Sequence, residues 1–398
     1  MNRPPRSEDG ISCTLPTWIY NDYEFFKLEA QQLFGSAWQL AGHINEIPNP
    51  GDFITLDVLN ARALVLRDTD GEPRAFHNVC SHRAHALVEG HRGSCPGFLT
   101  CPYHGWTFHL DGRNRAVNSP KSLNKLDRTP LGLKPIDIEV FMGFVFLRLQ
   151  PDGASIAERW APWVDELARY RLEEMQPLHE LREQTHNIDW KTTLESCLQD
   201  CHSPTGHRDR SALMEQDYER EVTPHGALRI SHRMLDEPRR NWSARHYAHI
   251  LPRFQHLPRG LNRRWSFFGL FPQVLLKVFP DHMETIQMIP VGPGKTRLRA
   301  QAYGLPDNSR DAKAARFLSR RINIRVQNED NALTGSAQQG LASQGHPSDV
   351  PADQVVILKG FFDWLQARIP AAQLPEAPRP GSLAAINETI TAAATRPR

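Results

Sequence analysis

Residues 78–106 of the chain read NVCSHRAHALVEGHRGSCPGFLTCPYHGW. This stretch holds a Cys-x-His pair at Cys80 and His82 and a Cys-x-x-His pair at Cys101 and His104, with 18 residues between the pairs. Each pair offers one thiol and one imidazole, which are ligands that transition metals prefer. The sequence therefore predicts one metal centre held by two loops, each supplying a cysteine and a histidine.

Two kinds of metal centre use this ligand set. One is a structural zinc site with two cysteines and two histidines, and the other is a Rieske [2Fe-2S] cluster, in which two histidines replace two cysteines on one iron. Zinc fingers usually place the two cysteines together and then the two histidines, whereas here each loop contributes one of each. This interleaving favours the cluster, and zinc remains the alternative.

The residues around the two pairs have the pattern of a small antiparallel β domain. From 51 to 149, short β-type runs alternate with Gly, Pro, Asn and Asp. Asp-Gly dipeptides at 70–71 and 111–112 predict hairpin turns near the two loops, because such turns need a positive φ. Before this region, residues 21–34 predict a helix with a polar cap and one apolar face.

The second half of the chain has a mixed pattern that predicts an α+β domain with a long late helix. The expected elements are helices at 155–170 and 190–201, strands at 265–270, 274–279, 284–290 and 296–303, and helices at 310–342 and 355–369.

Composition excludes several classes of protein. The chain has 398 residues, of which 40% are hydrophobic and 23% charged, as in ordinary globular proteins. A net charge of +2 gives no general attraction to nucleic acid or to an anionic membrane. No apolar run is long enough to cross a bilayer, and the N-terminus lacks a signal core. We expect a cytoplasmic protein that binds neither nucleic acid nor membrane.

A second candidate metal site lies in residues 190–207, WKTTLESCLQDCHSPTGH. His202 and His207 are five residues apart, which would place them about 140° apart on an ideal helix. Pro204 and Gly206 break the helix between them, so His207 can fold back onto the same site. One carboxylate from elsewhere would complete the two-histidine, one-carboxylate triad that binds non-haem Fe(II) and leaves positions open for O2.

With these motifs the chain resembles the terminal oxygenase (alpha) subunits of Rieske-type non-haem iron oxygenases, the ring-hydroxylating oxygenase family. The resemblance covers nearly the whole length and rests on residues 78–83, 101–106 and 189–207. It implies an α+β chain with an N-terminal antiparallel β Rieske [2Fe-2S] domain and a C-terminal helix-grip (START-like) catalytic domain. The expected domains are a helical lead-in at 1–40, the Rieske domain at 41–150, the iron domain at 151–370 and a flexible tail at 371–398.

The resemblance also implies the ligands of both metal centres. Cys80, His82, Cys101 and His104 would hold the cluster. His202, His207 and Asp330 would hold the mononuclear iron, with the adjacent Glu329 as the alternative carboxylate.

Two positions depart from the family pattern. Gln199 stands where the family usually has an Asp or Glu that bridges an iron histidine to a cluster histidine of the neighbouring subunit. An amide can hydrogen-bond to both rings but carries no charge, so we expect altered electron transfer between subunits. Asp200 is a possible substitute, although on a helix it points about 100° away. Ala84 replaces a frequent glycine of the cluster loop.

The implied activity is that of a multicomponent oxygenase. A separate reductase or ferredoxin would pass electrons from NAD(P)H to the cluster and then to the iron, where O2 is used to hydroxylate or oxidatively demethylate a small aromatic or amine substrate. The alternative chemistry is cis-dihydroxylation of an aromatic ring. The implied assembly is a head-to-tail homotrimer or an α3β3 complex. The chain has no Gly-x-Gly-x-x-Gly nucleotide-binding motif, so the reductase would be another chain.

The sequence also allows two interpretations from other functional classes. One is a non-catalytic helix-grip binding protein with a structural metal site, and the other is an electron carrier whose second iron site has degenerated. The sequence also leaves undecided whether the lining of the substrate pocket is apolar or binds cations. Several aromatic residues could line such a pocket or belong to the core: Tyr218, Trp242, Trp265, Phe267, Phe268, Phe271 and Phe279.

Overall fold

The structure is a computed structural model that describes residues 15–95, 97–118, 129–150, 153–198, 207–239, 241–252, 254–341, 343 and 356–394. The chain divides into two compact units. We call Gly35–Pro177 the small unit, and Met1–Phe34 together with Leu178–Arg398 the large unit. Each is described by itself below.

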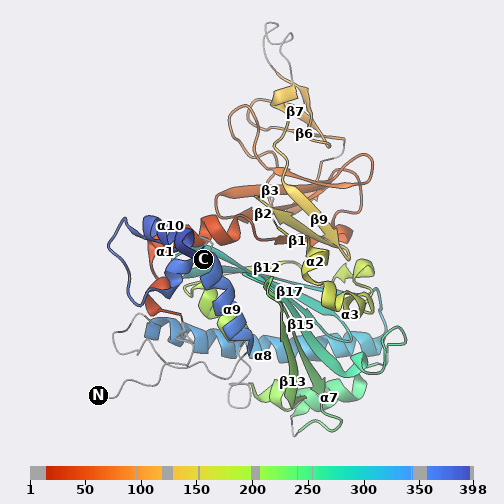
Figure 1. The fold of residues 1–398 in the computed structure, drawn as a ribbon. Coiled ribbons are helices and arrows are strands. Elements are labelled where there is room, and N and C mark those ends of the chain that lie inside the picture. Colours follow the sequence, from red (N-terminus) through yellow and green to blue (C-terminus); the bar gives the residue numbers. More distant parts are fainter. Residues whose placement is uncertain are drawn as a thin grey trace. The chain divides into compact units, whose positions relative to one another are not determined.

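The small unit is built from short antiparallel strands (Figure 1). Its described residues form three sheets, in the orders β4-β3-β2-β5, β6-β7-β8 and β1-β10-β9. Their strands are β1 Gln39–His43, β2 Asp52–Val58, β3 Ala61–Arg67, β4 Pro73–His77, β5 Arg92–Ser94, β6 Phe98–Thr100, β7 Thr107–His109, β8 Asn114–Ala116, β9 Asp137–Phe141 and β10 Phe144–Arg148. Both predicted hairpin turns are confirmed, with Gly71 and Gly112 at φ values of 85° and 86°.

The segment after β10 differs from the helix expected at 155–170. It forms α2 (Ile156–Arg159), a 3-10 turn (Ala161–Trp163) and α3 (Val164–Ala168), because Pro162 removes a backbone donor in the middle of the run. The backbone N–H groups of Ile156 and Ala157 donate to the Glu139 carboxylate on β9, at 2.9 and 3.1 Å. These contacts place the segment in the small unit, whereas we expected a domain boundary at residue 150.

The large unit is organised around one antiparallel sheet. Its strands follow the order β12-β18-β17-β16-β15-β14-β13. Their bounds are β12 Arg182–His186, β13 Met214–Val222, β14 Ala227–Met234, β15 Arg264–Leu270, β16 Val274–Val278, β17 Met283–Gly292 and β18 Lys295–Gly304. The four predicted strands are confirmed as β15 to β18. The strands β12, β13 and β14 were not expected from the sequence.

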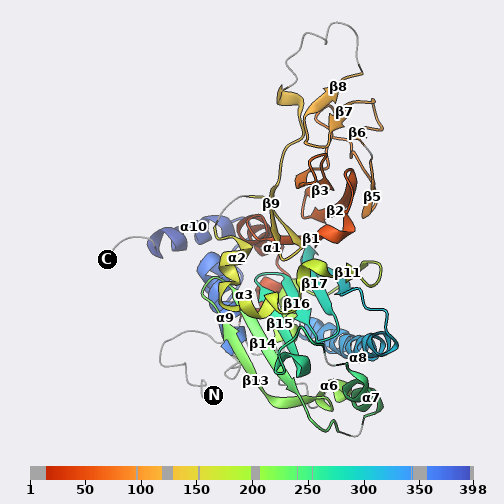
Figure 2. The same ribbon diagram turned by 90° about the vertical axis from the view of Figure 1, so that its right-hand side faces the viewer.

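Helices cover this sheet. The longest, α8, runs for 32 residues from Arg310 to Leu341. Figure 1 shows α8 crossing the strands, and Figure 2, turned by 90°, shows it lying to one side of them. Buried Leu318 and Ile322, one turn apart on α8, pack into a core with Trp265 of β15 and Tyr247 of α7. The other helices are α4 Trp190–Leu198, α6 Arg208–Ser211, α7 Trp242–Ile250, α9 Val356–Arg368 and α10 Leu383–Ala394.

Both ends of the described chain belong to the large unit. The predicted N-terminal helix is present as α1 (Tyr23–Glu29), and the Asp22 side chain caps it by accepting from the Phe25 N–H at 2.7 Å. The expected flexible tail instead contains α10. Its Asn387 side chain is buried and accepts from the Ala371 N–H at 3.0 Å, so this segment is ordered by its own hydrogen bonds.

We also searched the described ranges for a helix that could cross a bilayer. None of them is both long enough and apolar enough to do so.

Candidate metal centres and substrate cavity

The two Cys/His loops of the small unit share one backbone design. The N–H of Cys80 donates to the carbonyl of His85 at 2.8 Å, and the N–H of Ala84 donates back to the Cys80 carbonyl at 2.9 Å. The second loop repeats this pattern between Cys101 and Trp106 at 2.7 Å and between Gly105 and Cys101 at 3.0 Å. Each loop therefore closes on its own cysteine, and the two thiols occupy equivalent positions.

The residue four places after each cysteine has a left-handed backbone. Ala84 has φ 55° and Gly105 has φ 69°. Glycine adopts this conformation freely, whereas the Cβ of alanine is strained in it. This explains why glycine suits the position and why alanine is strained there.

The four donors divide into a buried pair and a more accessible pair. Cys80 and Cys101 are each 2% exposed and belong to the same core cluster of the small unit. The imidazole rings of His82 and His104 lie 4.7 Å apart, and His82 stacks on Trp106 at 4.7 Å with an interplanar angle of 7°. Burial raises the pKa of Cys80. Desolvation and the neighbouring His82 lower the pKa of His104, which favours the neutral ring that a metal ligand needs.

This division fits a two-iron cluster. One iron would take the two thiolates and the other the two imidazoles, as in a Rieske centre. Within the part of the chain that the structure describes, no three His, Cys, Asp or Glu side chains form a group that could hold a single metal ion. The loops thus bring together all four residues predicted from the sequence, as two adjacent pairs.

The second candidate centre lies in the large unit, where the start of α6 meets α8. His207, 2% exposed, precedes α6, and its Nε2 lies 3.2 Å from Oδ1 of Asp330. Its Nδ1 lies 3.1 Å from Oε2 of Glu329. The structure therefore brings His207 to both carboxylates between which the sequence could not choose. Gln199, Asp200 and His202 lie outside the described residues.

The two carboxylates have different surroundings. Asp330 is 17% exposed and lines a cavity, whereas the side chain of Glu329 is 38% exposed and lies on the other ring nitrogen of His207. Burial disfavours the charged imidazole, but Asp330 and Glu329 outweigh it and raise the pKa of His207. The arrangement suits Asp330 as a metal ligand beside Nε2, and Glu329 as the acceptor that orients the ring through Nδ1–H.

Polar contacts outside the site fix α6 against α8. Asp209, 7% exposed, accepts from Arg325 of α8 at 2.7 Å and from the Asn241 side chain at 2.6 Å. Arg325 lies about one turn before Glu329 and Asp330. Sequence reasoning missed Asp209 because its partners are more than 30 residues away in the chain.

A buried ionic group fixes α4, the helix that leads toward the second centre. Lys191 is fully buried, and its Nζ lies 2.7 Å from Oε1 of Glu29 and 2.8 Å from Oδ1 of Asp189. Desolvation raises the pKa of Glu29 to about 7, although Lys191 opposes the shift. Gln338 of α8 accepts from the Asp189 N–H and the Thr192 hydroxyl, at 2.9 and 3.0 Å. The group thus connects α1, α4 and α8.

A small cavity of about 30 Å³ lies beside His207 and Asp330. Most of its wall is apolar, and two basic residues, Arg210 and Lys277, also line it. The apolar lining comes from Cys197, Leu198, Leu228, Ile230, Phe267, Leu275 and Val326. Of the aromatic residues considered from the sequence, Phe267 lines this cavity, whereas Trp265, Phe268 and Phe279 are buried in the core.

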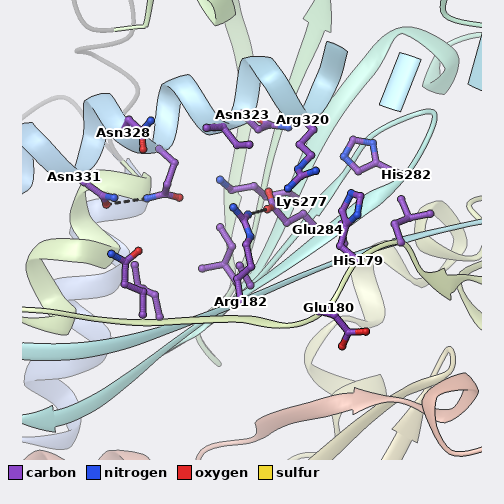
Figure 3. Close-up of a pocket in the computed structure, with 18 of the residues that line it drawn as sticks. His179, Glu180, Arg182, Lys277, His282, Glu284, Arg320, Asn323, Asn328 and Asn331 are labelled. Carbon is purple, nitrogen blue, oxygen red and sulfur yellow. Dashed lines mark hydrogen bonds and ion pairs between the residues drawn. The ribbon is translucent and has the colours of Figure 1, made fainter. Parts of the chain in front are cut away.

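A larger cavity of about 170 Å³ lies on the same helix. Side chains from α8 and from β12, β16 and β17 point into it (Figure 3). Lys277 lines both cavities, so they share a wall. The residues labelled in Figure 3 are His179, Glu180, Arg182, Lys277, His282, Glu284, Arg320, Asn323, Asn328 and Asn331.

Comparison with known proteins identifies the family. Residues 37–127 match the model of the Rieske [2Fe-2S] domain, and residues 167–371 match that of the ring hydroxylating alpha subunit catalytic domain. The chain belongs to the ring-hydroxylating oxygenase family. These two domains imply a Rieske cluster and a mononuclear iron. The predicted family, the α+β fold class and the oxidoreductase class are confirmed.

Three curated relatives of this oxygenase are named as monooxygenases of carnitine, choline or glycine betaine. The carnitine monooxygenase oxygenase subunit of Escherichia coli (strain K12) is 27% identical over 342 residues, 84% of this chain and 85% of that protein. The choline monooxygenase of Spinacia oleracea is 26% identical over 89% of this chain and 77% of its own length. The glycine betaine monooxygenase oxygenase subunit of Pseudomonas aeruginosa (strain UCBPP-PA14) is 32% identical over 53% of this chain and 49% of its own length.

Solved structures share the fold of this oxygenase. A quaternary ammonium Rieske monooxygenase in complex with L-carnitine has a TM-score of 0.72 at 21% identity, covering 88% of this chain and 94% of that one. The naphthalene 1,2-dioxygenase from a Rhodococcus species has a TM-score of 0.74 at 20% identity, covering 91% and 95%. These likenesses extend over both units.

Proposed function

We propose that this chain is the terminal oxygenase component of a multicomponent system that inserts oxygen from O2 into a small organic substrate. Electrons would come from NAD(P)H through a separate reductase, with or without a ferredoxin. The observation that carries the proposal is the contact of His207 with Asp330 at the wall of a cavity, within the domain that matches the oxygenase family.

Each group of donors has a part in this proposal. Cys80, Cys101, His82 and His104 would hold the [2Fe-2S] cluster, and His207, Asp330 and His202 would hold the iron. The bound iron would supply the open coordination positions at which O2 is activated. Glu329 would accept the Nδ1–H of His207 and so keep Nε2 turned toward the metal.

Electron transfer would run between subunits. We propose a head-to-tail homotrimer or an α3β3 assembly, in which the cluster of one chain serves the iron of the next. In support, inter-subunit electron transfer is described for a quaternary ammonium Rieske monooxygenase that shares this fold. Gln199, where the family usually has a carboxylate, would bridge the two centres with an uncharged amide, and Asp200 is the nearest alternative acid.

The reaction we favour is hydroxylation or oxidative demethylation. The carnitine, choline and glycine betaine monooxygenases among the relatives support this choice. A second candidate is cis-dihydroxylation of an aromatic ring, which the likeness to naphthalene 1,2-dioxygenase favours. Isotope incorporation from 18O2 separates the two. Hydroxylation puts one labelled atom into the product, demethylation puts one into the released formaldehyde, and cis-dihydroxylation puts two into the ring product.

The proposal is tested by O2 uptake with a surrogate Rieske reductase and NADH. We expect substrate-dependent uptake with labelled product, and we expect Asp330→Asn to abolish it while the cluster colour stays. Asp311→Asn, at an exposed acid in the first turn of the same helix, is the matched control and should leave the rate unchanged. Uptake that survives Asp330→Asn would contradict the assignment of the iron site. Ligand binding without any O2 use would favour the non-catalytic binding protein.

A further inference from the structure

Lys277 has a special position among the basic residues of the large unit, because it lines both cavities described above. On β16 it pairs in register with Phe267 of β15 and with Glu284 of β17. Burial raises the pKa of the Cys197 thiol to about 11; Lys277 opposes this shift and Asp330 adds to it, so both charges act on a residue of the smaller cavity. Lys277 therefore stands between the proposed iron ligands and the larger cavity.

The other charged residues of the larger cavity already have partners. Arg182 forms an ion pair with Glu284 at 3.2 Å, drawn as a dashed line in Figure 3. Arg316 donates to three backbone carbonyls, those of Asp281, Leu305 and Asp307.

In contrast, two cations of this cavity, Lys277 and Arg320, form no ion pair among the described residues. Neither the Lys277 ammonium nor the Arg320 guanidinium forms a side-chain hydrogen bond or an ion pair within the described ranges. Glu180, a further acid of the lining, lies apart from this group in Figure 3. The cavity therefore has a surplus of positive charge, supplied from β16 on one side and α8 on the other.

The same walls do not suit a quaternary ammonium ion. Such cations are bound by the faces of aromatic rings. Carboxylates can also attract them, but Glu284 is already paired with Arg182 and Asp330 with His207. Among the described residues that line the two cavities, Phe267 is the only Phe, Tyr or Trp. Its ring already has the guanidinium of Arg210 at 5.1 Å and the ammonium of Lys277 at 5.8 Å from its centroid. A third cation at this ring would meet two like charges.

We propose that the substrate of this oxygenase is an organic anion, and that Lys277 binds its carboxylate, with Arg320 contributing from α8. The inference rests on the proposed function, since it assigns the ligand of that same site. The names of the relatives suggest a substrate with a quaternary ammonium group, whereas our inference requires a carboxylate but not an ammonium group. The carboxylate at Lys277 would leave the apolar part of the substrate in the smaller cavity beside His207 and Asp330.

The test is a set of four probes of nearly equal shape, measured by isothermal titration calorimetry on the anaerobically purified full chain. Two probes carry a carboxylate: 3,3-dimethylbutanoate has only that charge, and glycine betaine has an ammonium as well. Their alcohol counterparts are 3,3-dimethylbutanol, which has no charge, and choline, which has only the ammonium. We expect each carboxylate probe to bind about tenfold or more tightly than its alcohol counterpart, as for a hydrogen bond to a charged group.

Variants assign the effect to Lys277. Lys277→Met should remove the carboxylate preference and Lys277→Arg should keep most of it, whereas Lys313→Met, at an exposed lysine of α8, should change nothing. Affinity that follows the ammonium, or equal affinity for carboxylates and alcohols, would overturn the inference. So would a carboxylate preference that survives Lys277→Met. Because binding is measured without turnover, these outcomes are separate from a failure of O2 uptake, which would count against the proposed function.

Discussion

At Ala84 the first cluster loop carries a methyl group in the left-handed backbone region, with φ 55°, while Gly105 of the second loop has none. We predict that Ala84→Gly stabilises the chain by about 0.5–1 kcal/mol, because the steric cost of alanine there exceeds the extra flexibility of glycine in the unfolded state. Denaturant unfolding monitored at the cluster absorption measures this.

The control is Ala61→Gly on β3, where the backbone is extended and glycine should destabilise. If Ala84→Gly lowered stability as much as Ala61→Gly, the strain assigned to Ala84 would be wrong.

Glu329 tests the division of labour between the two neighbouring carboxylates. Glu329→Gln keeps an acceptor for Nδ1 of His207 but removes its charge, so we predict iron retention about tenfold weaker, as for other partners of metal-bound histidines. Asp330→Asn should lose the iron altogether. Iron per chain after dialysis against a graded chelator measures both, and equal losses in the two variants would contradict our assignment of the ligand.

Glu195 gives a pH prediction. It accepts from the Tyr20 hydroxyl at 2.6 Å, and desolvation raises its pKa from the ordinary value of 4.5 to about 7. The folded pKa is above the unfolded one, so the folded state binds the proton more tightly, and stability falls as pH rises from about 4.5 through 7. Glu195→Gln cannot ionise, and we expect it to lose less stability between about pH 5 and pH 8. Parallel losses in wild type and variant, measured by urea unfolding, would refute this.

Single residues differ in how far the sequence could predict them. The four residues proposed to hold the cluster lie in two short motifs, so local spacing was enough to single them out as candidates. Choosing between Glu329 and Asp330 needed the position of His207, which is more than 120 residues away. The sequence did not single out Lys277, because the role proposed for it depends on two cavities that form only when β16 and α8 come together.

At the scale of elements, the four predicted strands have an apolar pattern, whereas two of the three missed strands, β12 and β13, are polar; the third, β14, is largely buried. β15 to β18 carry apolar residues on one or both faces. β13 reads MEQDYEREV and β12 reads REQTH, and most of their residues are partly or fully exposed. Pairing with β14 and β18 makes them strands, and no local pattern reveals such pairing.

The ionic group of Lys191 shows how one residue connects elements. Lys191→Met would leave Glu29 and Asp189 buried without their cation, and we predict a loss of about 3–5 kcal/mol. Lys295→Met, at an exposed position of β18, is the matched control. Urea unfolding of the holoprotein reports both, and similar midpoints for the two variants would contradict the role given to Lys191.

At the scale of the whole molecule, the division into two units is not sequential. Residues 1–40 were expected to be a separate lead-in, yet the described residues 15–34 group with residues 178–398. Contacts across hundreds of residues hold them there, among them Glu29 with Lys191 and Asn21 with Gln338. A sequence pattern describes neighbours along the chain, so it could predict helix α1 but not the unit to which that helix belongs.

The central claim is that one chain carries both a Rieske cluster and a mononuclear iron. Iron, zinc and acid-labile sulfide, measured per chain on anaerobically purified protein together with the visible spectrum, test it most directly. We predict about three irons and two sulfides per chain with a red-brown colour. Two irons with two sulfides would contradict the site at His207 and Asp330, and zinc without sulfide would contradict the oxygenase account as a whole.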